Sequence, residues 1–443
     1  MSSKTQTIAT KEEATPALVP KLRFPEFRGA EGWKGVRLSE LVGALDAGVS
    51  VNSGDRPATG NEIGILKTSA VTNGIFDPQE NKVVFDEAER GRVKEPVQGS
   101  TIIISRMNTP ALVGANAYVE TGFENLYLPD RLWAAKAKPG TSMRFLASIL
   151  GSDKGRAALS KLAKGSSGSM KNITKPDVLA FLVVAPSPAE QQKIAECLSS
   201  VDDLMAAQAR KVDALKTHKK GLMQQLFPRE GETQPRLRFP EFQNAGEWEV
   251  KRFDQLVSFQ SGGTPSKANP AFWNGSVPWV SAKDMKQLFL DDAEDHISAA
   301  AVDDGAKLVP SGALLMLVRG MTLLKDVPIC VIRREMSFNQ DVKALRPNDG
   351  IDGLFLALML TGSKDRLLEM VTVAGHGTGK LDTDELKAMA LMLPSPAEQQ
   401  RIATCLSRLD ALITAATQKL EALKTYKKGL MQQIFPAQDE EVA

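Results

Sequence analysis

Three short motifs contain residues that could catalyse a reaction, and two of them lack a residue that their chemistry needs. Residues 269–272, Asn-Pro-Ala-Phe, approach the Asn/Asp-Pro-Pro-aromatic loop that grips the target amine in amino-methyltransferases, but the second proline is missing. Residues 375–380, Gly-His-Gly-Thr-Gly-Lys, approach a phosphate loop. Ala374 stands where such a loop needs glycine, and Leu381 replaces the Mg²⁺-binding Ser or Thr. Neither motif therefore predicts catalysis.

The third motif, Glu249-Val250-Lys251, resembles part of a nuclease site, but an internal copy of this segment has Lys34, Gly35 and Val36 instead. No metal-binding carboxylate set is common to both copies. The three cysteines show no CxxC spacing, and the three histidines lie far apart without cysteine partners. The sequence thus predicts no catalytic residue, no metal site and no cofactor in this chain.

Length and composition indicate a globular protein with more than one core. The chain has 443 residues, about twice the commonest single-domain size, with 42% hydrophobic and 24% charged residues. It lacks the run of 18 or more apolar residues that a membrane span needs. Residues 1–20 are expected to be a disordered tail rather than a signal peptide, and residues 437–443 are expected to be a second tail. A cytoplasmic location is expected.

The net charge of +2 does not identify a nucleic-acid partner. Residues 28–185 contain 20 Lys and Arg against 16 Asp and Glu, a formal +4. Residues 243–393 contain 16 against 20, a formal −4. Any interaction with DNA must therefore depend on particular residues rather than on bulk charge.

An internal repeat organises the chain. Residues 20–42 and 235–257 share an opening that contains the sequence LRFPEF, and residues 186–228 and 394–436 share a closing segment that begins PSPAEQQ and ends KKGLMQQ(L/I)FP. The bodies between these segments are similar in length but mostly unlike in sequence. This pattern indicates duplication followed by divergence of the bodies toward different targets, and neutral drift of a duplicated fold is the alternative.

The closing segments predict two long helices. Ser187–Glu190 and Ser395–Glu398 match a capping box with proline at the first helical position. We expect each serine side chain to accept from the glutamate N–H, and each glutamate carboxylate to accept from the amide of its serine. Pro228 and Pro436 then end the helices.

Apolar residues follow a 4-3 spacing over some five heptads in both closing segments, which predicts a coiled-coil seam. Lys219 and Lys427 interrupt it. Forty-odd residues would make a helix of roughly 60 Å, too long for an ordinary surface helix, so we expect the two helices to pack on each other as an antiparallel pair. The predicted seam residues are Ile194, Leu198, Val201, Met205, Val212, Leu215, Leu222, Leu226, Ile402, Leu406, Leu409, Ile413, Leu420, Leu423, Leu430 and Ile434.

From about residue 20 to 436 the chain resembles the DNA specificity subunit of Type I restriction-modification systems. The likeness rests on the two LRFPEF openings, the doubled PSPAEQQ(K/R)IA starts and the doubled LKTxKKGLMQQ(L/I)FP ends. Residues 262–266 (GGTPS) and 272–280 (FWNGSVPWV) of the second body are also typical of that family. The order, spacing and duplication of these motifs all agree.

The resemblance implies a mixed α/β (α+β) fold with two target-recognition domains, residues 21–185 and 229–393, and two antiparallel spacer helices, residues 186–228 and 394–436. Each domain would recognise one half of a bipartite, asymmetric sequence in double-stranded DNA. Two methyltransferase (modification) subunits and the translocase-nuclease (restriction) subunits would be the partners. These partners would bring S-adenosylmethionine, ATP and Mg²⁺, and this chain would catalyse nothing.

Candidate DNA contacts are basic and amide side chains at the ends of strand-like runs. Arg106 follows the run 101–104 and Arg319 follows the run 314–318, so we interpret them as corresponding positions, with an internal ion pair as the alternative for each. Residues 165–171 and 375–380 are predicted to be polar loops that end the two domains. The predicted DNA-binding residues are Arg106, Asn108, Arg131, Lys171, Ser281, Lys283, Arg319, Thr322, Asn339, Gln340 and Lys380. Trp133, Trp273 and Trp279 are expected in the core.

Two other functions remain open at this point. The chain could be a structural coiled-coil adaptor without DNA contact, since the helices alone do not exclude it, or it could itself be a DNA methyltransferase or nuclease. Two large and different globular bodies argue against the adaptor, and the incomplete motifs argue against the enzyme.

Overall fold

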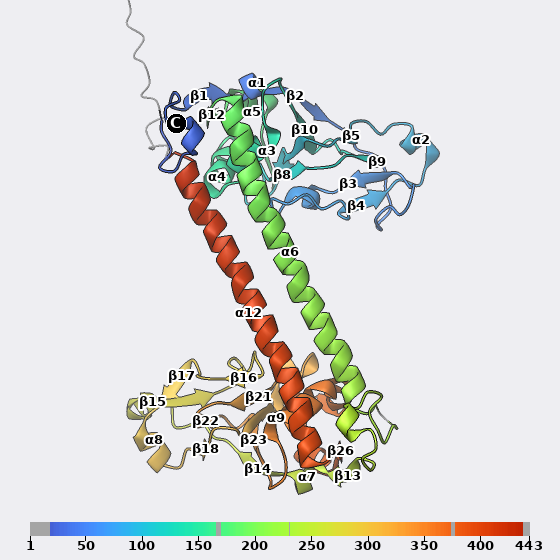
Figure 1. The fold of residues 1–443 in the computed structure, drawn as a ribbon, viewed down its shortest axis with the longest axis vertical. Coiled ribbons are helices and arrows are strands. Elements are labelled where there is room, and N and C mark those ends of the chain that lie inside the picture. Colours follow the sequence, from blue (N-terminus) through green and yellow to red (C-terminus); the bar gives the residue numbers. More distant parts are fainter. Residues whose placement is uncertain (1–17, 165–169, 230, 374–376, 437–443) are drawn as a thin grey trace, which may run out of the picture. The chain divides into compact units, whose positions relative to one another are not determined.

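The computed structural model describes residues 18–164, 170–229, 231–373 and 377–436. The chain divides into two compact units, residues 1–207 with 421–443 and residues 208–420. Each unit contains one globular mixed α/β domain and a part of each of two long helices, α6 (Pro188–Leu226) and α12 (Pro396–Ile434) (Figure 1). The predicted fold class is confirmed. No helix in the described part of the chain is long and apolar enough to cross a membrane.

The first domain has two four-stranded sheets, with strand orders β2-β10-β6-β8 and β4-β3-β9-β5. Two pairs of short strands, β1-β12 and β11-β7, complete it. Its elements are β1 (Lys34–Arg37), α1 (Leu38–Leu41), β2 (Val42–Ala47), β3 (Gly64–Leu66), β4 (Asn81–Val83), α2 (Glu87–Arg90), β5 (Pro96–Val97), β6 (Thr101–Ser105), β7 (Met107–Asn108), β8 (Asn116–Val119), β9 (Phe123–Tyr127), β10 (Leu132–Ala137), α3 (Met143–Leu150), α4 (Asp153–Lys161), β11 (Lys171–Asn172), α5 (Lys175–Ala180) and β12 (Leu182–Ala185), with 3₁₀ turns at Pro25–Phe27 and Thr68–Val71.

The second domain repeats this plan with sheets β14-β23-β19-β21-β16, β17-β15-β22-β18, β13-β26 and β20-β25-β24. Its helices and 3₁₀ turns are η3 (Pro240–Phe242), α7 (Phe253–Leu256), η4 (Pro270–Phe272), α8 (Ala299–Asp303), η5 (Met321–Leu324), α9 (Gly353–Gly362), α10 (Lys364–Glu369) and α11 (Thr383–Ala388). Its strands are β13 (Glu249–Arg252), β14 (Val257–Ser261), β15 (Trp273–Val280), β16 (Phe289–Leu290), β17 (Asp295–Ile297), β18 (Leu308–Val309), β19 (Leu314–Leu317), β20 (Arg319–Gly320), β21 (Ile329–Ile332), β22 (Met336–Phe338), β23 (Val342–Pro347), β24 (Val371–Val373), β25 (Gly379–Leu381) and β26 (Ala390–Leu393).

Apolar strands and one helix form the cores. The runs 102–104 and 314–317 are completely buried, because both faces of these central strands are covered. Helix α9 is apolar on every side, as expected of a helix enclosed by its domain. The prediction that Trp133 and Trp279 are core residues is confirmed, while Trp273 is half-buried and packs edge-to-face on Trp279.

The long helices pair in opposite directions, as predicted. In the first unit Ile194 and Leu198 near the start of α6 share a core cluster with Ile434 at the end of α12. In the second unit Leu226 at the end of α6 shares a cluster with Ile402 near the start of α12. None of the predicted seam residues is exposed, and the two interrupting lysines form ion pairs with the opposite helix.

The capping boxes are only half as predicted. The N–H groups of Glu190 and Glu398 lie 3.4 Å from the Ser187 and Ser395 hydroxyls, in agreement with the prediction. The two carboxylates, however, bind Arg23 and Arg238 of the LRFPEF openings through two hydrogen bonds each, at 2.7–2.8 Å. A buried guanidinium is a stronger partner for a carboxylate than a cap amide, so these glutamates join the opening of each half to its closing helix.

Two other expectations concern segment boundaries. Leu18, within the predicted tail, exchanges backbone hydrogen bonds with Trp33 in both directions. Residues 1–17 and 437–443 lie outside the described residues, as do residues 165–169 and 375–376 of the predicted polar loops. The described ends of those predicted loops are not loops: Lys171 lies in strand β11 and Lys380 lies in strand β25.

Candidate nucleic-acid interface

In each domain a short strand follows a central strand: Arg106 joins β6 to β7, whereas Arg319 is the first residue of β20, which follows β19. The N–H of Ile173 donates to the carbonyl of Arg106, and the N–H of Leu381 donates to the carbonyl of Val318, both at 2.9 Å. These bonds make Val318, not Arg319, the structural equivalent of Arg106. The predicted correspondence of the two arginines is therefore wrong by one residue, and a shift of one residue in a strand turns a side chain to the other face.

The two arginines consequently have different surroundings. The Arg106 Nε donates to the Asp130 carbonyl at 2.7 Å, and its guanidinium lies 5.7 Å from the centre of the Trp133 ring. Arg319 is exposed. Neither arginine has an ion pair with another described residue. Arg106 is held in place by its own domain, whereas Arg319 is available to a ligand.

The other candidates of the first domain gather around Arg106. Asn108 in β7 is the strand partner of Lys171 in β11, and the Arg106 N–H donates to the carbonyl of Arg131. Arg131 is exposed and Lys171 is half-buried. Asn108 is buried, and its amide lies 3.3 Å from the Ser105 hydroxyl while its oxygen accepts from the Thr109 N–H. Asn108 thus shapes the turn that presents its neighbours.

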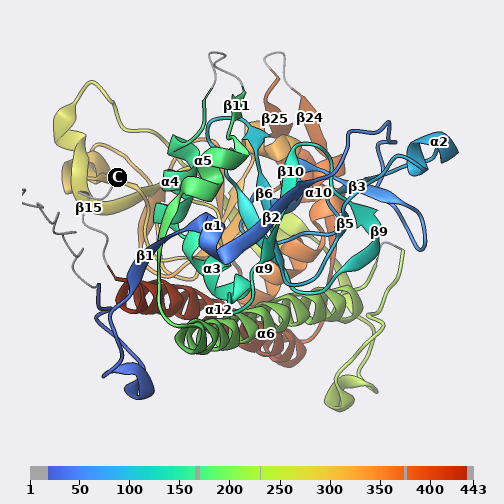
Figure 2. The same cartoon turned by 90° about the horizontal axis from the view of Figure 1, so that it is seen from above.

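In the second domain, β20 pairs with β25 so that Arg319 lies opposite Lys380. The Lys380 ammonium lies 3.2 Å from the Asp382 carboxylate, and Thr322 is exposed in the 3₁₀ turn after β20. Figure 2 shows β11 and α6 on opposite sides of the first domain, and β24 and β25 on the side of the second domain away from α12. The strands that contain Lys171 and Lys380 therefore lie away from the long helices.

A second group follows two parallel strands of the second domain. Ser281 comes directly after β15 and Asn339 directly after β22, and the Asn339 N–H donates to the Val280 carbonyl at 2.9 Å. Gln340 accepts from the Thr264 hydroxyl, and Ser281 donates to Asp284. The carboxyl ends of parallel strands commonly form ligand sites, so this edge is a second candidate surface.

Lys283 at this edge contacts Glu294 and Asp295 at 3.1 and 3.0 Å. Asp295, followed by Glu294, raises the pKa of the Lys283 ammonium above its usual value. Lys283 therefore stays charged, but its charge is already neutralised by two carboxylates of the same domain.

The structure adds Lys67, which the sequence reading missed. It follows β3, the parallel partner of β9 in the first domain, as Ser281 follows β15. Its ammonium lies 2.9 Å from Glu80. One signal was present in the sequence: Lys67 lies 34 residues after Trp33, and Ser281 lies 33 residues after Trp248 of the second opening. Lys67 and Ser281 each begin a polar segment that follows a short apolar run.

Metal ligands and a reactive thiol were two further possibilities for a site. No group of three or more His, Cys, Asp and Glu in the described ranges could hold a metal ion. Burial raises the pKa of the Cys330 thiol to about 12, which keeps it protonated and unreactive.

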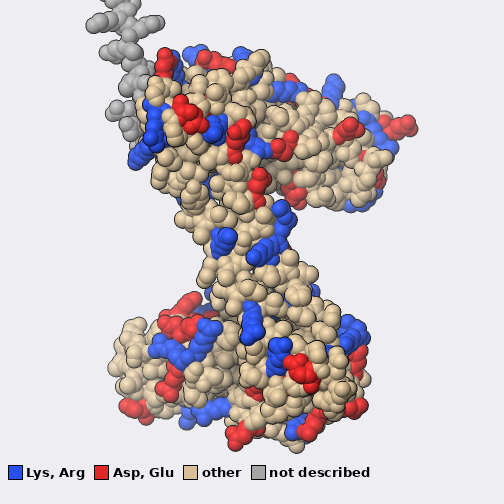
Figure 3. Space-filling view, in the orientation of Figure 1, with Lys and Arg blue, Asp and Glu red and all other residues tan. Residues whose placement is uncertain are grey.

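Acidic and basic side chains are interspersed on each domain over the face in Figure 3, in keeping with the small net charge.

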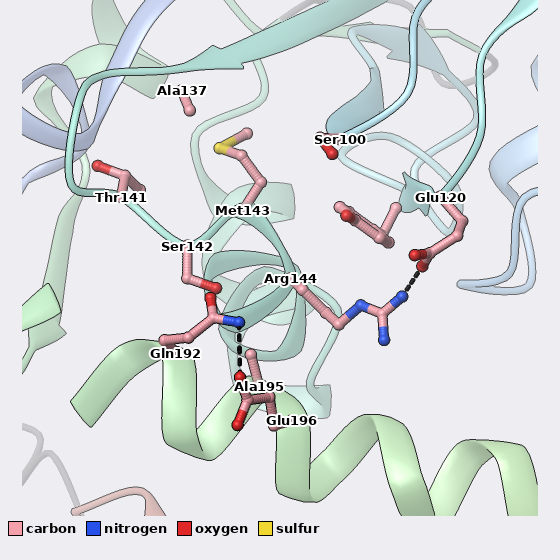
Figure 4. A pocket seen from close by; sticks show the side chains of 11 residues that line it. Ser100, Glu120, Ala137, Thr141, Ser142, Met143, Arg144, Gln192, Ala195 and Glu196 are labelled. Carbon is pink, nitrogen blue, oxygen red and sulfur yellow. Dashed lines mark hydrogen bonds and ion pairs between the residues drawn. The ribbon is translucent and has the colours of Figure 1, made fainter. Parts of the chain in front are cut away.

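The first unit contains a pocket of about 440 Å³ beside the start of α6 (Figure 4). Arg144 forms an ion pair with Glu120 there, and Gln192 donates to Glu196 at 3.0 Å. None of the predicted DNA-binding residues lines it. Its charged groups are thus paired within the chain rather than directed at a ligand.

Comparisons with known proteins agree with this architecture. The family model described as "Type I restriction modification DNA specificity domain" matches residues 30–217 and 245–425. The EcoR124I/EcoR124II specificity subunit of Escherichia coli is 33% identical over 177 residues, which cover 40% of this chain and 44% of that relative. The MjaIX specificity subunit of Methanocaldococcus jannaschii is 27% identical over 194 residues, 43% of this chain and 44% of that relative.

These alignments thus span less than half of either curated relative. Among solved structures, the S subunit of a Type I restriction-modification system from M. genitalium superposes with a TM-score of 0.59 at 15% identity, covering 95% of this chain and all of that one. At that identity the likeness concerns the fold. Since the family model matches the chain in two successive segments that together cover most of it, as the internal repeat predicts, the chain belongs to the family of Type I restriction-modification DNA specificity domains.

Proposed function

We propose that this chain is a DNA-recognition subunit in which each domain recognises one half of a bipartite, asymmetric sequence in double-stranded DNA. One observation carries the proposal: the two domains share the order of four strands in each of their two larger sheets but present different side chains at equivalent strand ends. Such a pair suits the recognition of two different short sequences, because base edges are distinguished by the side chains placed against them.

The partners follow from the duplicated surfaces. In both halves an LRFPEF opening is fixed to the start of a long helix by a buried Arg–Glu pair, so the chain offers two similar surfaces to two identical methyltransferase subunits. Restriction subunits with translocase and nuclease activity would complete the complex in the cytoplasm.

Catalysis is assigned to those partners. The described residues include no metal-binding cluster, and residues 375–380 lack the Gly and Ser/Thr of a phosphate loop. The donors among the described residues therefore do not fit Mg²⁺, and we assign S-adenosylmethionine, ATP and Mg²⁺ to the other subunits. In this proposal the chain supplies only the sequence specificity.

The test is to co-express the chain with its modification subunit in a host without other DNA methylation, and to map modified bases by single-molecule sequencing. We expect one motif of two defined parts separated by a fixed gap. Methylation by the purified chain alone, with S-adenosylmethionine, would show that it is an enzyme. Assembly of the complex without sequence-selective binding in a mobility shift would favour the coiled-coil adaptor.

A further inference from the structure

Two cations of the first domain lie beside one buried tryptophan ring. The Arg106 guanidinium lies 5.7 Å and the Lys175 ammonium 6.0 Å from the centre of the Trp133 ring. Trp133 belongs to β10, Arg106 follows β6, and Lys175 begins α5, so three separate elements bring the group together. We call these three residues the first cation site.

The groups that hold these cations are neutral. The Arg106 Nε donates to the Asp130 carbonyl, and the Arg106 Nη groups form no hydrogen bond with a described residue. Neither Arg106 nor Lys175 forms an ion pair with a described residue. An aromatic ring face attracts a cation through its quadrupole but, unlike a carboxylate, does not cancel the charge. The first cation site therefore keeps two positive charges close together, which favours an anion as its ligand.

Strand register places Lys343 of the second domain at the position of Trp133. Trp133 pairs with the residue two places before Arg106, and Lys343 pairs with the residue two places before Val318. Val318 and Arg106 are themselves equivalent positions. The neighbouring strands correspond as well, since β10 lies between β2 and β6, and β23 lies between β14 and β19. A lysine of the second domain thus lies where the first domain holds its two cations on a ring.

Lys343 is also held by a neutral group. Its Nζ donates to the Ser261 hydroxyl, and it has no ion pair with a described residue. Burial, followed by the neighbouring Lys387, lowers the pKa of the Lys343 ammonium, and a bound anion would oppose both effects. Lys283 and Lys380 of the same domain contact carboxylates instead. Ser261 and Lys343, the second cation site, therefore also keep a charge that no described carboxylate pairs with.

The phosphate backbone of DNA is the anion that both sites can share. The adjoining strand pair differs between the domains, because Met107 and Asn172 of the first correspond to Arg319 and Lys380 of the second. The cation sites keep a positive charge at the same place, although different residues supply it. Two different DNA half-sites differ in their base edges but have the same phosphates. Charge that is kept while its neighbours change therefore favours a phosphate contact over a base contact.

We infer that each cation site binds a phosphate of the DNA backbone, through Arg106 and Lys175 in one half-site and through Lys343 in the other. The inference rests on the proposed function and assigns to these residues a sequence-independent contact that positions each domain on its half-site. It adds Lys175 and Lys343 to the predicted contacts, and it makes Arg106 a phosphate contact rather than a base contact.

The experiment measures the affinity of the assembled complex for its mapped target over a range of salt concentrations. Lys175→Gln and Lys343→Gln each remove a charge but keep a polar side chain. A phosphate contact releases counterions, so each substitution should reduce the slope of log K against log salt concentration by about 0.9. Affinities for the target and for an unrelated duplex should fall by the same factor, because the contact does not depend on sequence.

Lys138→Gln is the matched control. Lys138 is exposed and is also held by a neutral group, the Ser39 carbonyl, but it follows the other end of β10. Its substitution should leave the slope unchanged.

Neutral methylphosphonate linkages, introduced one at a time along both strands, then identify the phosphates. We expect one position in one half-site that weakens binding by the unaltered complex but has little further effect on the Lys175→Gln complex. A position in the other half-site should behave in the same way with Lys343→Gln.

Three results would overturn the inference while leaving the proposed function intact. An unchanged salt slope in either variant, with normal assembly in gel filtration, would refute the assignment for that domain. A change in the recognised sequence would make the residue a base contact, and loss of assembly would make it a contact with a protein partner. An unaltered complex without any sequence-selective binding would instead refute the proposed function itself.

Discussion

Arg23 and Arg238 each place a guanidinium in a buried site against the glutamate that starts the helix of the same half. The side chains of Arg23 and Glu190 are 6% and 1% exposed, and the repeat has 8% and 1% for Arg238 and Glu398. The carboxylates raise the pKa of both arginines further. These pairs explain why LRFPEF and PAEQQ occur together in both halves, since one motif supplies the partner of the other.

Removal of one partner should therefore be costly. Arg23→Ala leaves the Glu190 carboxylate buried with only the Trp33 indole, 3.3 Å away, as a side-chain donor in the described structure. We expect a loss of about 3–5 kcal/mol in the free energy of unfolding, measured by denaturant titration. Lys34→Ala is the control, because Lys34 and Glu31 form an exposed pair, and it should change stability by less than about 1 kcal/mol. Equal effects of the two substitutions would contradict a structural role for the buried pair.

The two candidate arginines should respond differently to alanine. Arg319→Ala removes an exposed side chain, so we expect unchanged complex assembly and a change in stability within about 0.5 kcal/mol, but loss of modification at the target. Arg106→Ala removes the contact with Trp133 and the bond to the Asp130 carbonyl, and should also lower the melting temperature. Methylation mapping together with thermal unfolding separates the two. Normal methylation by Arg319→Ala would exclude Arg319 as a DNA contact.

At the scale of elements, two ion pairs connect the long helices. Lys219 contacts Asp410 at 2.6 Å in the second unit, and Lys427 contacts Asp202 at 2.6 Å in the first. The repeat offset of 208 converts one pair into the other, since 219 + 208 = 427 and 410 − 208 = 202. Lysines that interrupt the apolar seam thus have a function: each has a carboxylate partner only when the helices are antiparallel and in this register.

Charge reversal tests this register. Asp410→Lys places two cations together and should destabilise the protein by on the order of 1 kcal/mol. The exchange Lys219→Asp with Asp410→Lys should recover most of the loss, as measured by a double-mutant cycle in thermal or denaturant unfolding. Additive effects of the two substitutions would show that the pair contributes nothing to register.

Sequence predicted the elements with local signals and missed the contacts that depend on distant segments. The long helices follow from proline, capping serine and heptad spacing, all of which lie within forty residues. The partner of Glu190 is 167 residues away, so the local capping rule gave the wrong donor for its carboxylate. The predicted equivalence of Arg106 and Arg319 failed for a similar reason. The two bodies are unlike in sequence, so only the strand register shows that Val318, and not Arg319, is the equivalent of Arg106.

At the scale of the whole molecule, two bodies with little shared sequence have the same plan. The order β2-β10-β6-β8 corresponds to β14-β23-β19-β21, and the parallel pair β3-β9 corresponds to β15-β22. Buried central strands require only apolar character, which many sequences satisfy. Exposed strand ends are free of that constraint, so they can differ between the domains and supply two different specificities.

Both long helices contribute residues to both units, so their length should determine the gap between the two half-sites. Insertion of four residues, one helical turn, near Thr217 would add roughly 6 Å to α6. We expect the mapped target to keep both half-sites and to lengthen its gap by about one or two base pairs, since base pairs are about 3.4 Å apart. Because Lys219 pairs with Asp410 beyond the insertion, a second variant should carry a matching insertion in α12 near Leu412 to keep that pair aligned. An unchanged gap in a complex that still methylates DNA would show that the helices do not set the spacing.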